Sequence, residues 1–175
     1  MSEVIKTPIE GLKIGLNKTI GDVRGYLCEV APGGTENEFV GGKIGNVYCA
    51  TATQKGIARG GHYHNSLIEN FYTLTGSALW LFKDFRESSK TFGETYVAIF
   101  GDEKVEGIEA DQYVLPESMA QLLVPEGVYH VFYPLTDKKV IVMALTNLPH
   151  DNDDYVRLAV EEDDDLKKLK EKLLK

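Results

Sequence analysis

The stretch GIARGGHYHNSLIENFYTLTG, residues 56–76, contains His62, His64 and Glu69 at a spacing typical of a metal site. Side chains two apart on a β-strand share one face, so His62 and His64 point the same way. We expect Glu69 to follow a tight turn and to lie on the neighbouring strand. A second segment, PEGVYH, then supplies His130 from a distant strand. The four side chains are therefore expected to converge.

Three imidazoles and one carboxylate suit a divalent ion, with zinc as the first choice and iron, manganese or nickel as alternatives. A lone histidine is more often simply hydrogen-bonded or exposed. Here, however, three of the four histidines fall on these positions, and only His150 lies elsewhere. We predict His62, His64, Glu69 and His130 as metal ligands. The sequence does not identify the metal.

Length and composition indicate one all-β domain. The chain has 175 residues, 43% of them hydrophobic, and its 17 glycines are spread through short alternating runs. A net charge of −8 argues against a nucleic-acid partner. No apolar run is long enough to cross a bilayer, and the start lacks a signal-peptide pattern. The expectation is a cytoplasmic protein with no membrane partner.

The end of the chain has a different composition from the body. Residues 151–165 contain eight acids, and residues 166–175 combine leucines with lysines. Acids at the start and lysines at the end suit the helix dipole, so 161–174 is expected to form an amphipathic helix. We expect this helix to pack on its own barrel or on a dimer mate rather than to bind another partner. The predicted division is a barrel domain at 1–150, then an acidic linker and helix at 151–175.

The spacings G-x5-H-x-H-x4-E-x6-G and P-x-G-x-x-H resemble the two signature motifs of the cupin superfamily. Cupins are small antiparallel β-barrels that hold a metal inside. The resemblance implies an all-β double-stranded β-helix, or jelly roll, and the C-terminal segment adds a short helix.

Four segments resemble the dTDP-4-dehydrorhamnose 3,5-epimerases more closely, in the family's order: residues 21–29, 59–63, 84–93 and 124–132. This resemblance implies a nucleotide-diphosphate sugar as partner, with Arg24 and Arg59 holding the diphosphate. It also implies that His62 is the base that removes a proton next to a ketone. A homodimer is expected, in which the N-terminal segment joins the partner's sheet and Glu29 lies near the seam.

The chain departs from this family at its acid–base residues. The family's active-site lysine falls on Glu69, and its catalytic tyrosine aligns near Met143. The aspartate that orients the histidine aligns near Asn147, and two inward polar positions fall on Val47 and Cys49. Residues 59–64, RGGHYH, also resemble an R-G-x-H-Y-H segment in the zinc-bearing cupin half of a capsule-sugar reductase–epimerase. The 3,4-ketoisomerases of dTDP-sugars have a similar R-G-x-H-x-H segment.

The predicted function is epimerisation or keto isomerisation of a dTDP- or UDP-linked 4-keto-6-deoxyhexose, by metal-assisted proton transfer next to the ketone. A liganded His62 is not a free base, so Tyr72, Tyr129, Tyr133 or a metal-bound hydroxide are the candidates for that role. The predicted catalytic set is therefore His62, Glu69 and these three tyrosines. Two alternatives stay open: a metal cupin of another class, such as an oxygenase or small-molecule isomerase, and a non-catalytic sugar-binding cupin.

Overall fold

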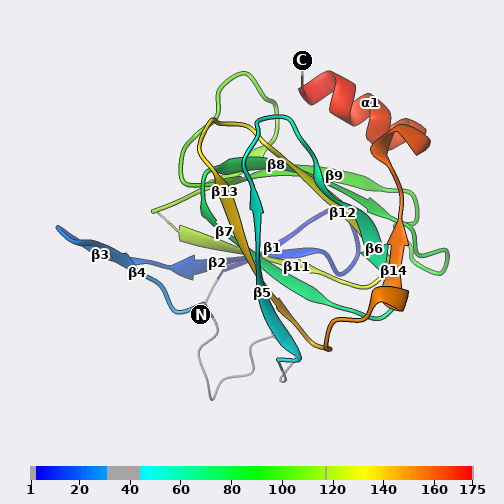
Figure 1. Cartoon of the computed structure of the whole chain (residues 1–175), viewed down its shortest axis with the longest axis horizontal. Coiled ribbons are helices and arrows are strands. Elements are labelled where there is room, and N and C mark those ends of the chain that lie inside the picture. Colours follow the sequence, from blue (N-terminus) through cyan, green and yellow to red (C-terminus); the bar gives the residue numbers. More distant parts are fainter. Residues whose placement is uncertain (1–2, 31–43, 117, 175) are drawn as a thin grey trace.

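The computed structural model describes residues 3–30, 44–116 and 118–174, and it consists of two six-stranded sheets packed against each other (Figure 1). The first sheet has the strand order β1 (Glu3–Lys6), β2 (Lys13–Lys18), β11 (Ser118–Val124), β7 (Glu69–Thr75), β13 (Val140–Thr146) and β5 (Asn46–Ala52). The second has the order β10 (Asp111–Val114), β9 (Thr95–Gly101), β8 (Ser77–Asp84), β12 (Val128–Pro134), β6 (Arg59–His64) and β14 (Tyr155–Arg157). A separate hairpin joins β3 (Ile20–Asp22) and β4 (Gly25–Leu27). The predicted all-β jelly roll is confirmed.

The core between the sheets follows from the two-residue period of the strands. Phe71 of β7, Trp80 of β8 and Phe132 of β12 point inward, with ring centroids of Trp80 at 5.1 Å from Phe71 and 4.8 Å from Phe132. Their sequence neighbours belong to other clusters: Tyr72 packs outside the first sheet and Tyr133 outside the second. The alternation of side chains between the two faces of a strand therefore decides which residues of β7 and β12 reach the interior.

The C-terminal segment is part of the barrel. Strand β14, within the stretch interpreted as a linker, pairs with β6 over three residues. Helix α1 (Asp164–Leu173) follows and buries Leu166 and Leu173 on the outer face of the second sheet. The predicted amphipathic helix is thus present and packs on its own barrel, whereas the division at residue 150 stays a prediction. A three-residue strand among acids gives no periodic signal, so the sequence did not indicate β14.

In the described part of the chain, no helix is long and apolar enough to cross a membrane. The cytoplasmic location stays a prediction.

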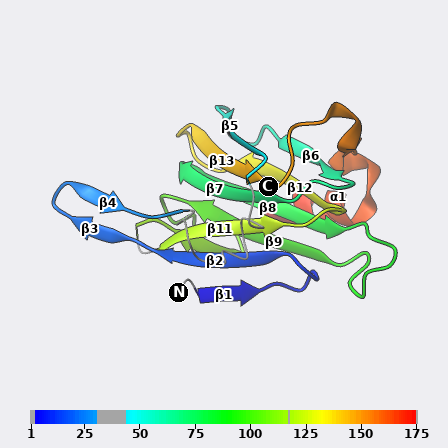
Figure 2. The same ribbon diagram turned by 90° about the horizontal axis from the view of Figure 1, so that it is seen from below.

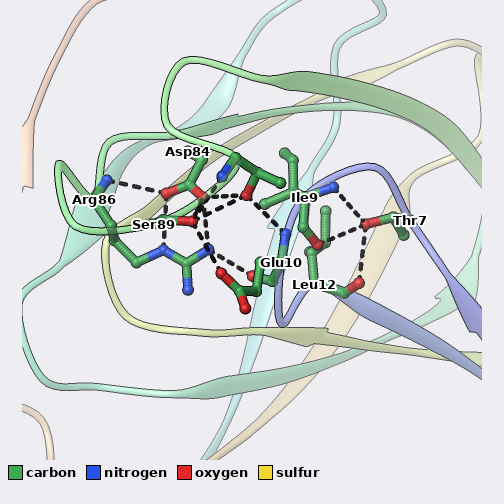
Figure 3. Close-up of polar contacts among 8 residues, drawn as sticks. Thr7, Ile9, Glu10, Leu12, Asp84, Arg86 and Ser89 are labelled. Atoms are coloured by element: carbon green, nitrogen blue, oxygen red, sulfur yellow. Dashed lines mark hydrogen bonds and ion pairs between the residues drawn. The ribbon is translucent and has the colours of Figure 1, made fainter.

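The segment 84–93, one of the four family-like segments, forms a hydrogen-bonded clamp around the buried Asp84 (Figure 3). The Asp84 carboxylate is fully buried and accepts hydrogen bonds from Arg86 Nε at 2.8 Å, Ser89 Oγ at 2.7 Å and Thr91 Oγ1 at 2.7 Å. Burial by itself raises the pKa of Asp84, but these donors outweigh it and lower the pKa. The motif therefore has a structural role at the end of β8.

The clamp also joins two other turns to β8. Arg86 Nη2 donates to the carbonyl of Glu10, and the Glu10 backbone N–H donates to Thr91 Oγ1 at 2.9 Å (Figure 3). Gly127, in the turn before β12, has φ +71° and would place a Cβ 2.3 Å from Arg86 Cγ. Only glycine fits there without displacing the arginine. The clamp thus holds the turn that precedes His130 on β12.

Candidate metal centre and cavity

The structure brings the four predicted ligands together inside the barrel. Strand β6 supplies His62 and His64, β7 supplies Glu69, and β12 supplies His130 directly opposite His62 in the antiparallel register. One potential ligand atom from each residue lies within 4.8 Å of the other three. His64, Glu69 and His130 are almost completely buried, and His62 is partly buried.

The inner atoms of this cluster face one another without satisfying one another. Glu69 Oε2 lies 3.3 Å from His64 Nε2 and 3.1 Å from His130 Nε2. Yet Glu69 Oε2, His64 Nε2 and His62 Nδ1 are all buried without a hydrogen-bond partner. Leaving buried polar atoms unpaired is costly, and a cation between them would remove that cost. These donors, three nitrogens and one carboxylate, fit a divalent ion.

Protonation is consistent with this fit. Burial, helped by the neighbouring His130, lowers the pKa of His62 to about 3, which leaves the neutral imidazole that metals bind. Burial also acts to raise the pKa of Glu69, but the adjoining imidazoles of His130 and His64 lower it overall. The glutamate is therefore a carboxylate at neutral pH.

Three outer contacts turn the ligands toward the centre. The Asp154 carboxylate lies 3.1 Å from His64 Nδ1, and the Val128 carbonyl lies 3.3 Å from His130 Nδ1. Tyr48 donates a 2.6 Å hydrogen bond to Glu69 Oε1, which leaves Oε2 directed inward. Partners of this kind fix the tautomer and orientation of metal-binding side chains. Sequence reasoning missed both Asp154 and Tyr48.

A cavity of about 480 Å³ opens beside the cluster. Its base is apolar and buried, formed by Phe71, Trp80, Phe132 and Val142. His62 and His130 line one side, with Tyr48 and Tyr155. The exposed side chains of the lining belong to Arg59, His150 and Arg157, which lie at the mouth. Arg59 was predicted at a binding site, whereas Tyr155, His150 and Arg157 were not.

The three tyrosines predicted to be catalytic lie outside the barrel interior. Tyr72 packs on the outer face of the first sheet and donates to the Val30 carbonyl at 2.7 Å. Tyr129 donates to the Leu158 carbonyl at 3.0 Å, and Tyr133 packs with it among the residues that α1 covers. Their assignment is wrong because each is an odd number of residues from an inward ligand, Glu69 or His130. The two-residue period would have shown this.

At the positions aligned with other catalytic residues of the family, the side chain that faces the cavity is the sequence neighbour of the aligned residue. Val47 and Cys49 are exposed on β5, while Tyr48 lines the cavity. Met143 packs outside with Tyr72, and its neighbour Val142 lines the cavity. A one-residue register error moves every side chain of a strand to the opposite face.

The position aligned with the orienting aspartate does not reach the histidines. Asn147 instead accepts a 2.9 Å hydrogen bond from the Ile68 backbone N–H and so holds the turn before β7. Asp154 orients His64 in its place.

Arg24 and Glu29 do not reach the cavity of their own chain. Arg24 lies at the tip of the β3–β4 hairpin, where its side chain is 86% exposed and paired with Asp22. Both views show this hairpin projecting from the side opposite β6 and β14 (Figures 1 and 2). Glu29, just after β4, is exposed as well.

Comparison with known proteins defines the family. The family model described as dTDP-4-dehydrorhamnose 3,5-epimerase matches residues 6–167. The chain belongs to this family. A dTDP-4-dehydrorhamnose 3,5-epimerase of Shigella flexneri is 30% identical over 151 residues, covering 82% of this chain and 74% of the relative. The Bacillus subtilis spore coat polysaccharide biosynthesis protein SpsL is 25% identical over 145 residues, covering 83% and 84%.

Solved structures share the fold of this epimerase family. A Bacillus anthracis dTDP-4-dehydrorhamnose 3,5-epimerase with TDP and PPi bound superposes with a TM-score of 0.76 at 22% identity, covering 95% of this chain and 88% of that one. A sugar 3,4-ketoisomerase from Thermoanaerobacterium thermosaccharolyticum, in complex with TDP, gives 0.63 at 21% identity, covering 91% and 96%. As a family member, the chain is an isomerase-type enzyme of nucleotide sugars, as the sequence predicted.

Proposed function

We propose that this epimerase-family chain catalyses proton transfer next to the ketone of a nucleotide-linked 4-keto-6-deoxyhexose, with a divalent ion at its centre. The supporting observation is the cluster of His62, His64, Glu69 and His130, in which His62 Nδ1, His64 Nε2 and Glu69 Oε2 are buried without hydrogen-bond partners. When bound there, the ion would supply positive charge beside the ketone oxygen. Zinc is the first choice of metal.

Both outcomes begin with the removal of one proton. A base takes it from the carbon next to the ketone, and the electron pair shifts onto the ketone oxygen. Return of a proton to the opposite face of that carbon gives the epimer. Return to the former ketone carbon, with the proton of the neighbouring hydroxyl passing to the former ketone oxygen, gives the keto isomer. Positive charge near the oxygen makes the first step easier because that oxygen becomes negative.

Tyr155 is the cavity residue that we assign to proton return. Its ring lies 4.8 Å from that of His62 and 4.4 Å from that of His64, and it lines the cavity. A tyrosine hydroxyl is protonated at neutral pH and can donate. The Tyr155 hydroxyl lies 3.3 Å from Nδ1 of the exposed His150, whereas the Tyr48 hydroxyl donates to the metal ligand Glu69 Oε1, so Tyr48 has a different role. It is a positioning residue for the metal ligand.

Asp154→Ala tests the metal centre from outside its ligand set. Without the carboxylate, His64 Nδ1 loses the 3.1 Å partner that fixes its tautomer and orientation. We expect metal affinity to fall about 10- to 100-fold, as for other such outer partners. Competition with a chromophoric chelator measures this. Asp153→Ala, the exposed neighbouring acid, is the matched control and should keep full affinity. Equal affinities in both variants would contradict the orienting role of Asp154.

We also propose that the chain works as a homodimer, in which the β3–β4 hairpin of each chain reaches the other. The hairpin exposes Ile20 and Leu27 to 67% and 59%, and no third strand among the described residues covers it. Exposed apolar side chains and unpaired strand edges favour association with a second copy. In such a dimer, Arg24 and Glu29 contribute to the second chain's site.

Light scattering should give twice the chain mass of 19.5 kDa at micromolar concentration. Ile20→Asp and Leu27→Asp together should shift the protein toward the monomer, because buried charges weaken an apolar interface. A wild-type monomer under these conditions would rule out the dimer.

A further inference from the structure

The mouth of the cavity is positively charged although the chain as a whole carries −8. Arg59 and Arg157 line it with His150, and none of the lining residues is an aspartate or glutamate. Within the described residues, neither arginine forms an ion pair. Two guanidinium groups without acidic partners at one opening attract an anion.

The two arginines come from neighbouring strands. Strand β6 lies between β12 and β14; Arg59 begins β6, and Arg157 ends β14 opposite His62. The Arg157 guanidinium carbon sits 4.8 Å from the centre of the Tyr155 ring, which also faces the cavity. This cation–π contact holds Arg157 beside the metal cluster.

Burial gives the cavity a direction. Its apolar base and His130 are buried and His62 is partly buried, whereas both arginines are exposed. A ligand with a neutral ring at one end and phosphates further out would therefore enter ring first. Planar guanidinium groups suit phosphate oxygens because they donate two parallel hydrogen bonds.

We propose that Arg157, together with Arg59, binds the diphosphate of the nucleotide sugar at the mouth of the cavity. Each chain then carries two phosphate-binding arginines of its own, whatever Arg24 of a second copy adds. The assignment rests on the proposed function, since it takes the ligand to be a nucleotide-diphosphate sugar. It adds a binding residue from the C-terminal segment that neither the motif nor the spacing indicated.

Calorimetry with dTDP on the metal-loaded protein tests this assignment. Arg157→Gln and Arg59→Gln should each weaken binding about ten- to a hundredfold, the loss expected for charge-assisted hydrogen bonds. The affinity of Arg157→Lys for dTDP should lie between those of the wild type and Arg157→Gln, because lysine keeps the positive charge but does not donate two parallel hydrogen bonds. In turnover, Arg157→Gln should raise KM far more than it lowers kcat. Lys138→Gln is the matched control, since this exposed lysine pairs with Asp102 and Glu103 away from the cavity.

The metal content of each variant is measured as well. A content equal to that of the wild type would show that β14 still packs on β6. An Arg157→Gln affinity within twofold of that of Lys138→Gln overturns the inference, as does a wild type that does not bind dTDP. Deuterium exchange into a 4-keto sugar tests the proposed reaction separately. Exchange with dTDP binding that is independent of Arg157 rejects the inference alone, whereas Arg157-dependent binding without exchange rejects the reaction alone.

Discussion

Purified protein incubated in heavy water with a dTDP- or UDP-linked 4-keto-6-deoxyhexose should place deuterium on the carbon next to the ketone. Removing the metal with a chelator should slow this exchange by at least about 10²–10³-fold, the effect of losing one strong electrophilic group. The physical reason is that a proton next to a ketone is only weakly acidic. Charge at the oxygen must come from a nearby cation, and the family's lysine position holds Glu69. Mass spectrometry of the recovered sugar measures the exchange.

Glu69→Gln should have the same effect by emptying the site. The amide keeps the shape but loses the negative charge that faces His64 and His130 at 3.3 and 3.1 Å. Glu126→Gln, an exposed glutamate in the turn before β12, is the matched control and should keep both metal and exchange. Exchange that persists without metal would return His62 to the role of free base. No exchange with either nucleotide would leave the proposed reaction without support.

Asp84→Ala should lower the free energy of unfolding by about 3–5 kcal/mol, the cost of breaking a buried ion pair by removing one partner. Arg86, with a side chain only 21% exposed, loses its carboxylate, and the Ser89 and Thr91 hydroxyls lose their acceptor. Urea denaturation followed by circular dichroism measures the change. Glu87→Ala, an exposed acid three residues along the chain, should change stability by less than about 0.5 kcal/mol. Similar losses in both variants would contradict the clamp.

The Asp84 carboxylate also makes the stability of the protein depend on pH, in a direction that follows from its pKa. The donors around Asp84 lower its native pKa below the unfolded value of about 3.9. Its stabilising contribution is therefore complete above about pH 4 and is lost as the pH falls toward the native pKa. Wild-type stability should decline in this acid range, and the Asp84→Ala curve should be flatter there.

The sequence by itself determined the barrel and the contents of its metal centre. His62 and His64 are two positions apart, and on one strand this spacing places both side chains on the same face. The order of the motifs placed Glu69 and His130 beside them, as found. The C-terminal helix was predicted from its charges and leucines. Local periodicity shows which face an element buries, in a helix as in a strand.

Which other side chains meet that centre was decided only by the tertiary structure. Tyr48 comes from the edge strand β5, where the family alignment was one residue off and pointed to Val47 and Cys49 instead. Asp154 and Arg157 come from a short stretch among acids, where the pattern is too short to report a face. Pairing of β14 with β6 carries Arg157 to a point opposite His62, 95 residues earlier in the chain. Contacts over such a separation depend on strand register, and a shift of one residue would turn each of these side chains to the other face.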